Sequence, residues 1–102
     1  MRYNSRKTFA IINLPALVSN YQCLANLAPQ SNTIAVIKAD AYGHGAIAVA
    51  KSLSAHAPAL AVAFIDEALT LREAGITLPI LILEGALSQE DFSIALTQNF
   101  WL

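Results

Sequence analysis

Short, wholly apolar runs alternate with helix-like segments along this sequence, and this alternation limits the possible folds more than any other feature. The runs TIAVIK, ALAVAF and PILIL occupy residues 33–38, 59–64 and 79–83. Strands that are covered on both faces require continuous apolar runs of this kind. Strands that are joined by single helices pair in parallel through right-handed crossovers. The sequence therefore predicts an α/β architecture.

The segments around these strands predict the remaining elements. A further strand is expected at residues 8–13, and another begins at residues 100–102. Pro15 suits the first turn of a helix that Pro29 ends. The other helices are expected over residues 47–55, from Asp66 and Glu67 to a left-handed Gly75, and from Ser88, with Asp91 as its capping partner, to Gln98.

The chain has few charged residues for a domain of its size. Of its 102 residues, 56% are apolar or aromatic and 13% are charged, against about 25% charged in an ordinary soluble domain. A small domain leaves much of its surface in water and needs a polar coat. Three kinds of chain could have so few charges: a membrane protein, a chain covered by a partner, or one part of a larger folded body. We expect that this chain is part of a larger folded body. The predicted fold is the N-terminal portion of a (β/α)8 TIM-like barrel with about three to four βα units, and a doubly wound sheet is the alternative.

Charge and cysteine content exclude several classes of function. The formal net charge is −1, so no overall field attracts nucleic acid. Three basic residues, Arg2, Arg6 and Lys7, lie at the start of the chain, and Lys38 is the only lysine or arginine between positions 8 and 50. Cys23 is the single cysteine, which excludes an internal disulfide and indicates a reducing, cytoplasmic environment. No metal cluster is expected.

Two membrane-related interpretations are weaker. The basic start followed by TFAIINLPALV has the outline of a secretory signal, but Asn13 and Pro15 interrupt its apolar core. The charge-free stretch at residues 8–37 is long enough for a spanning helix, but polar residues and Pro29 divide it into pieces shorter than about 18 apolar residues. We therefore expect no membrane association.

Lys38 is the first candidate functional residue. It is expected at the carboxyl end of a buried strand, where barrel enzymes place their reacting groups. Burial of an unpaired ammonium would lower the pKa of this lysine and enrich the neutral amine, which attacks carbonyl compounds. The alternative is structural, because Lys38 could pair with Asp40 or Glu84 and simply end the strand.

The residues after Lys38 favour a ligand site. Gly43 and Gly45 permit a tight loop, and the Tyr42 hydroxyl could serve a phosphate or a carboxylate. Tyr42 could equally be a half-buried loop anchor, and GHG is too short for a phosphate-cradling motif. His44 is assigned no role.

The segment AVIKADAYGHG at residues 35–45 resembles the attachment segment for pyridoxal 5'-phosphate (PLP) in bacterial alanine racemases, where KADAYGHG or KANAYGHG follows a strand. IINLPALVSNYQCL, LAVAF and IDEALTLREAGITLPILILEG are similar to other parts of that family in the same order. The resemblance covers residues 8–100. It implies a PLP-dependent isomerase that interconverts L-alanine and D-alanine and supplies D-alanine for peptidoglycan.

The resemblance also implies roles for particular residues. Lys38 corresponds to the lysine that holds PLP covalently and then moves the Cα proton of D-alanine. Tyr42 corresponds to a tyrosine that contacts the cofactor phosphate, and Leu83 falls near a position that lines the cofactor pocket. Racemisation needs an acid/base group on each face of the carbanion. In the family a tyrosine from the C-terminal β domain of the second subunit of a homodimer supplies the other group.

These implications set the expected domain organisation and leave alternatives open. Residues 1–102 are expected to be an N-terminal fragment of the PLP-binding barrel domain, without the C-terminal β domain and inactive alone. A non-catalytic PLP-binding barrel for cofactor homeostasis and a structural module with an inert lysine are the competing hypotheses. Serine is not excluded as a substrate.

Overall fold

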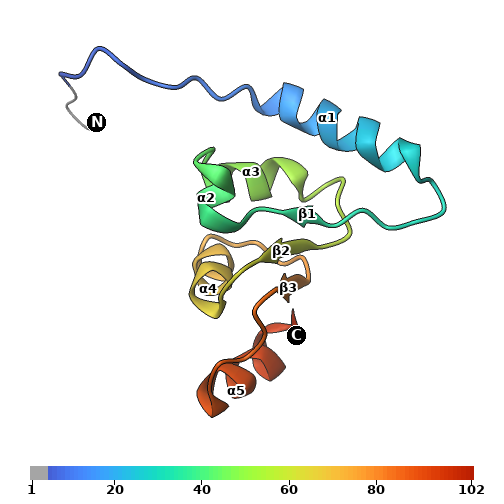
Figure 1. Cartoon of the computed structure of the whole chain (residues 1–102), viewed down its shortest axis with the longest axis vertical. Helices are drawn as coiled ribbons and strands as arrows, with labels where there is room; N and C mark the ends of the chain where they lie inside the picture. The colour runs from blue at the N-terminus through green and yellow to red at the C-terminus, as the bar shows by residue number, and fades with distance from the viewer. Residues whose placement is uncertain (1–4) are drawn as a thin grey trace.

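The computed structural model describes residues 5–102, which form a four-stranded sheet with helices between the strands (Figure 1). Arg2, which belongs to the basic start of the chain, lies outside the described residues. The strands are β1 (Ala35–Val36), β2 (Leu60–Val62), β3 (Ile80–Ile82) and β4 (Phe100–Trp101). The helices are α1 (Leu14–Leu27), α2 (Lys38–Tyr42), α3 (Ala46–Leu53), α4 (Ile65–Glu73) and α5 (Gln89–Gln98). The predicted α/β architecture is confirmed.

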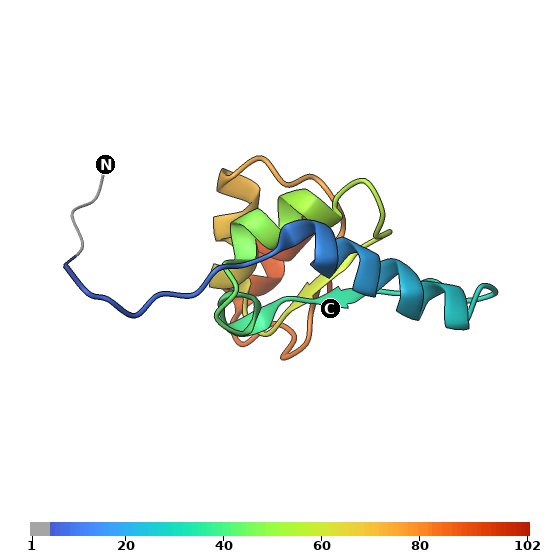
Figure 2. The same ribbon diagram turned by 90° about the horizontal axis from the view of Figure 1, so that it is seen from above.

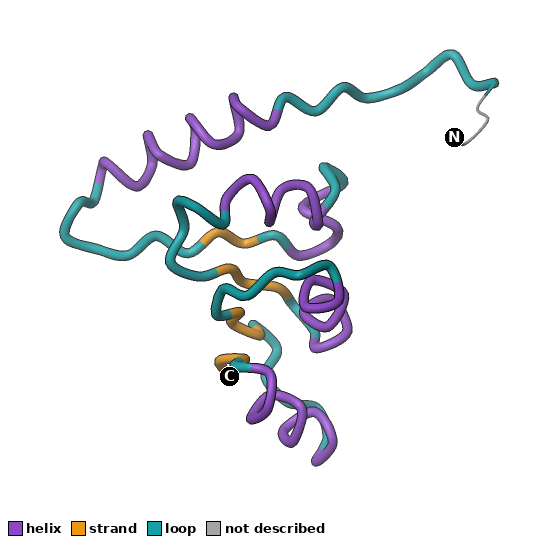
Figure 3. Tube along the Cα trace, turned by 180° about the vertical axis from the view of Figure 1, so that it is seen from behind, coloured by secondary structure: helices purple, strands orange, loops and turns teal. Residues whose placement is uncertain are grey.

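The strands lie side by side in chain order, β1-β2-β3-β4, and each neighbouring pair is parallel (Figure 3). Helices α3, α4 and α5 gather on one side of these strands (Figure 2). Successive βα units of a barrel have this order and cover one face, whereas a doubly wound sheet reverses its strand order and carries helices on both faces. The arrangement is therefore that of part of a (β/α)8 barrel, with the sheet open rather than closed.

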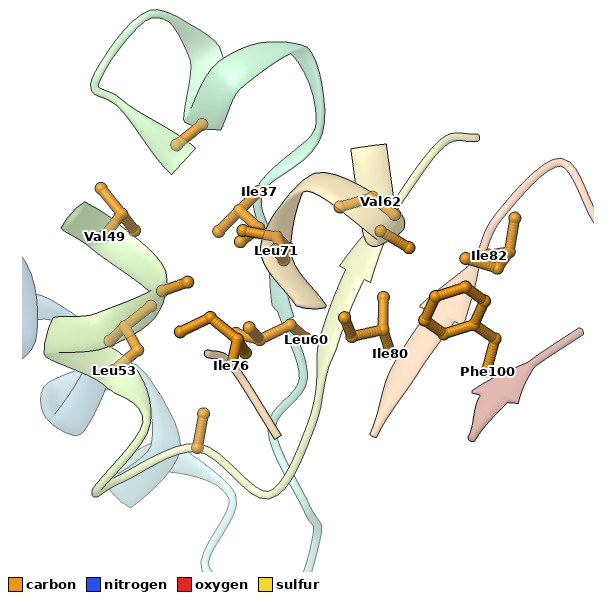
Figure 4. Packing of buried hydrophobic residues seen from close by; sticks show 14 of the residues in the cluster. Ile37, Val49, Leu53, Leu60, Val62, Leu71, Ile76, Ile80, Ile82 and Phe100 are labelled. Atoms are coloured by element: carbon orange, nitrogen blue, oxygen red, sulfur yellow. The ribbon is translucent and has the colours of Figure 1, made fainter. Parts of the chain in front are cut away.

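The two faces of the sheet carry different side chains, because successive strand residues point in opposite directions. On the helix-covered face the core contains side chains from the strands and from α3 and α4, including Leu60, Val62, Ile80, Ile82, Phe100, Val49, Leu53 and Leu71 (Figure 4). On the other face Val36, Ala61, Leu81 and Trp101 lie in register across the sheet. This second apolar row has the character of the interior of a barrel.

The helix ends follow the sequence signals. The start of α1 has a cap that the sequence did not predict, because Asn13, expected at the end of a strand, accepts a hydrogen bond from the Ala16 N–H at 3.0 Å through its side chain. Gly75 has φ +92° just after α4, which is the left-handed conformation expected there. The Ser88 hydroxyl accepts from the Asp91 N–H at 3.0 Å, but the Asp91 carboxylate accepts from the Leu87 N–H. The predicted capping pair at α5 is therefore confirmed in one direction only.

Two strand predictions need correction. Residues 8–13 form no strand, and Ile11 is 83% exposed, because no neighbouring strand pairs with this described segment. The strand expected at residues 33–38 is limited to β1 and ends before Lys38. It is also an edge strand and is not covered on both faces, since Val36 is 41% exposed.

Arg72 of α4 binds backbone carbonyl oxygens at the amino end of the sheet. Its guanidinium donates hydrogen bonds to the carbonyl oxygens of Ile76 and Leu78 at 2.9 and 2.8 Å, just before β3. It also donates to the Gln98 carbonyl from Nε at 3.0 Å and from Nη2 at 2.8 Å, and it lies 5.2 Å from the centre of the Phe100 ring. Burial lowers the pKa of this guanidinium. The Arg72 side chain therefore connects α4 to the segments that lead into β3 and β4.

Within residues 5–102, no helix is both long enough and apolar enough to cross a bilayer.

Candidate active site

The carboxyl ends of the first three strands meet at one edge of the sheet. The ladder continues past the strands, because the Ile37 N–H donates to the Ala61 carbonyl and the Leu83 N–H donates to the Val62 carbonyl, both at 2.8 Å. This pairing places Lys38 and Leu83, which follow Ile37 and Ile82, at the same end of the sheet. Leu83 is 46% exposed there.

Lys38 is the first residue of α2 and is half-buried, whereas the sequence predicted a buried strand end. The predicted alternative, an ion pair with Asp40 or Glu84, is wrong for the described residues, among which the Lys38 amine has no hydrogen bond or ion pair. The Asp40 carboxylate instead accepts a hydrogen bond from the Ala46 N–H at 2.8 Å, at the start of α3. The amine of Lys38 is therefore not neutralised by a carboxylate of this part of the chain.

Helix α2 is a left-handed turn. Its residues Ala39, Asp40, Ala41 and Tyr42 have φ values of 52°, 55°, 54° and 55°. Left-handed helical backbone costs roughly 1–2 kcal/mol for each residue that carries a Cβ. Strain of this kind persists only where the surrounding structure fixes it, and it is concentrated at active sites and ligand clamps. The turn after Lys38 is therefore the most unusual backbone among residues 5–102.

Internal hydrogen bonds hold this turn together. The Gly43 N–H donates to the Ala39 carbonyl at 3.2 Å, and the Gly45 N–H donates to the Asp40 carbonyl at 2.9 Å. The His44 N–H donates to the Ala41 carbonyl, and His44 Nδ1 lies 3.0 Å from the same oxygen. The amides of the GHG loop are thus used inside the turn, so they do not form a cradle for a phosphate.

Tyr42 ends the left-handed turn and is 60% exposed. It is therefore not the half-buried loop anchor that the sequence offered as an alternative. Its hydroxyl has no hydrogen-bond partner within residues 5–102. Lys38 and Tyr42 are the first and last residues of α2, and neither the Lys38 amine nor the Tyr42 hydroxyl has a partner within residues 5–102.

These groups match the chemical needs of PLP. This cofactor requires an amine for its aldehyde and a hydrogen-bond donor for its phosphate, and the side chains of Lys38 and Tyr42 could supply these groups, because neither is engaged within the described residues. No group of three or more histidine, cysteine or acidic side chains within the described part of the chain could hold a metal ion.

Glu67 makes a contact at this edge that the sequence does not predict. The pattern indicated only an acid at the start of α4, which is confirmed. Its carboxylate also accepts a hydrogen bond at 2.8 Å from the N–H of Ala39, which follows Lys38 directly. No local sequence signal reveals this contact, because the two residues meet only when β1 and β2 pair.

Comparisons with known proteins identify the family. The family model described as "Alanine racemase, N-terminal domain" matches residues 12–102. The alanine racemase of Chromohalobacter salexigens is 53% identical over 97 residues, which cover 95% of this chain and 27% of that protein. The catabolic alanine racemase of Pseudomonas aeruginosa is 49% identical over 96 residues, which cover 94% and 27%. The chain therefore spans about a quarter of the length of these relatives.

Solved structures agree with the sequence comparisons. The biosynthetic alanine racemase of Pseudomonas aeruginosa superposes with a TM-score of 0.80 at 37% identity, over 85% of this chain and 24% of that chain. The alanine racemase of Oenococcus oeni gives a TM-score of 0.80 at 40% identity, over 87% and 23%. The arrangement of strands and helices is thus shared with experimental structures of these enzymes.

Proposed function

The chain belongs to the alanine racemase family, and from that premise we propose that it is the N-terminal part of the barrel domain of an enzyme that interconverts L-alanine and D-alanine. The observation that carries the proposal is the position of Lys38, which lies at the carboxyl edge of the sheet with its amine unpaired within the described residues. On this proposal residues 1–102 require the remaining barrel units and a C-terminal β domain for activity.

We propose that Lys38, Tyr42 and Leu83 contribute to the binding of PLP. The Lys38 amine would hold the cofactor covalently, the Tyr42 hydroxyl would donate to its phosphate, and Leu83 would line the pocket. PLP, when bound, supplies the electron sink that makes the Cα proton of alanine acidic. Lys38 Nζ, once released by the substrate, would hold that proton on one face of the substrate carbon.

Lys38 serves only one face, so racemisation requires a second acid/base group on the opposite face. We propose that this group is a tyrosine of the second subunit in a homodimer. The product would serve peptidoglycan synthesis, and the protein would act in the cytoplasm. The 102-residue chain alone would then show no turnover.

A coupled assay for L-alanine formed from D-alanine tests the proposal in the full-length, PLP-loaded protein. We expect turnover there and none with the isolated chain. Absence of turnover in a PLP-loaded dimer would remove the racemase assignment, and turnover by the isolated chain would contradict the need for a second acid/base group. The reading frame after Leu102 gives a further check, because a β domain is expected and a gene that ends after one barrel would favour a PLP-storage protein.

Covalent labelling tests the role of Lys38 separately from turnover. Borohydride reduction after mixing with PLP, followed by peptide mapping, should place the label on Lys38. Labelling of another lysine, such as Lys51 on α3, in the folded protein would contradict the proposed cofactor site.

A further inference from the structure

The Glu67 carboxylate connects two elements at the carboxyl edge of the sheet. One oxygen, Oε1, accepts hydrogen bonds from the N–H groups of Ala63 and Phe64 at 2.9 and 3.0 Å. The other oxygen, Oε2, accepts from the Ala39 N–H at 2.8 Å. Ala63 and Phe64 directly precede α4. Ala39 belongs to the left-handed turn and lies 28 positions before Glu67 in the sequence.

The two oxygens have different tasks. Capping of α4 needs one acceptor for the free N–H groups at its start, and Oε1 supplies it. Capping does not require the contact with Ala39. The base of Glu67 is fixed in place, because Ile65, Ala68 and Leu71 of the same helix are buried in the core at 6%, 0% and 1% exposure. Oε2 is therefore a fixed acceptor beside the turn.

The contact falls at the peptide unit that Lys38 shares with Ala39. The N–H of Ala39 and the carbonyl of Lys38 lie in one rigid plane. Ala39 is also the first residue with positive φ, at 52°, so this plane marks the change from ordinary backbone to left-handed backbone. A hydrogen bond that fixes the plane limits the rotation of the backbone at Lys38 and thereby the direction in which its side chain leaves the main chain.

We propose that Glu67 is a positioning residue for Lys38, acting through the Ala39 N–H. This proposal rests on the proposed function, in which Lys38 holds PLP. Glu67 itself touches neither the amine nor, on this proposal, the cofactor. Its role is to hold the left-handed turn that follows Lys38 in its observed conformation.

The test uses the full-length protein with the variants Glu67→Gln and Asp66→Asn. In Glu67→Gln the remaining oxygen caps α4, and the amide NH2 replaces Oε2 opposite the Ala39 N–H, so two donors face each other. Asp66→Asn is the matched control, because it removes the same charge from the first turn of the same helix at an exposed position whose carboxylate does not contact the turn.

Two readouts other than turnover are followed. PLP titration by visible absorbance should show about tenfold weaker cofactor binding in Glu67→Gln, the equivalent of one hydrogen bond to a charged group. Borohydride trapping should show a correspondingly smaller fraction of label on Lys38 at limiting PLP. Asp66→Asn should stay within twofold of the unsubstituted protein in both measurements.

A second variant removes the donor instead of the acceptor. Replacement of the Ala39 N–H by an ester oxygen leaves Glu67 intact to cap α4, and it should weaken PLP binding by a similar factor. This variant decides the question if Glu67→Gln does not fold. Binding and trapping at the level of the unsubstituted protein in either folded variant would overturn the proposal. Absence of label on Lys38 in the unsubstituted protein would instead refute the proposed function.

Discussion

At the carboxyl end of the sheet the amine of Lys38 has no partner within residues 5–102, whereas at the amino end the Arg72 guanidinium donates to the carbonyls of four residues. The backbone differs in the same sense. The carboxyl end contains four consecutive left-handed residues other than glycine, Ala39 to Tyr42, while the turn after α4 at the amino end places glycine, Gly75, at its positive φ. The carboxyl end thus contains left-handed strain and an amine without a partner among residues 5–102. At the amino end the polar groups are hydrogen-bonded, and the positive φ falls on a glycine.

On the proposed function, this difference separates reactivity from stability within one small sheet. In barrel enzymes the reacting groups lie at the carboxyl ends of the strands, and the opposite end serves mainly stability. The two ends described here follow that division. It predicts that substitutions at the two ends affect different measurements.

The largest expected effect is on turnover. Lys38→Ala in the full-length protein should lower racemase activity at least about a thousandfold, because the proposed covalent anchor and one acid/base group are lost together. Its thermal midpoint without PLP should stay unchanged, since Lys38 has no partner to lose among the described residues. Lys51→Ala on exposed α3 surface is the control and should leave both quantities unchanged. A large loss of stability in Lys38→Ala would show that the lysine is structural.

Substitution of Arg72 at the amino end should lower stability and leave the labelling of Lys38 in place. Arg72→Met removes the donors that satisfy carbonyls before β3 and β4, and we expect the free energy of unfolding to fall by about 3 kcal/mol. Urea denaturation of the full-length protein measures this change. Arg72→Lys should lose less, because an ammonium reaches some but not all of these carbonyls. Borohydride labelling of Lys38 should persist in both variants at low urea, and its disappearance there would contradict the independence of the two ends.

A smaller effect is expected at Tyr42. Tyr42→Phe removes a hydroxyl that has no partner within residues 5–102, so stability should change by less than about 0.5 kcal/mol. PLP binding in the full-length protein should weaken by about tenfold, because the proposed hydrogen bond to the phosphate is lost. Tyr21→Phe is the matched control, since the Tyr21 hydroxyl donates to the Thr33 carbonyl at 2.7 Å and serves only the fold. It should reduce stability and leave PLP binding unchanged.

The sequence predicted the regular parts of this fold because they depend on local patterns. Apolar runs locate β2 and β3, and Pro15, Gly75 and Ser88 mark helix ends where the structure has them. The strand expected at residues 8–13 is wrong because a strand exists only with a partner, and an apolar run alone does not supply one.

The candidate site was less predictable. The motif singled out Lys38 and Tyr42, and the structure brings them to one turn. The left-handed conformation could not be foreseen, because alanine, aspartate and tyrosine all favour negative φ and only the following Gly43 hints at a reversal. The hydrogen bond between Glu67 and Ala39 could not be predicted for another reason, since it depends on the pairing of two strands.

The smallest expected effect tests whether the turn is strained at all. Ala39→Gly removes an exposed Cβ from a residue at φ 52°, and we expect the free energy of unfolding to rise by about 0.5–1 kcal/mol, because the relief of left-handed strain exceeds the added entropy of the unfolded chain. Ala48→Gly is the matched control at an exposed position of right-handed α3 and should lower it by about 1 kcal/mol. Urea denaturation of the full-length protein compares the two. Changes of the same sign would mean that the turn carries no strain, whereas opposite signs would place the strain at the end of the sheet that holds the lysine.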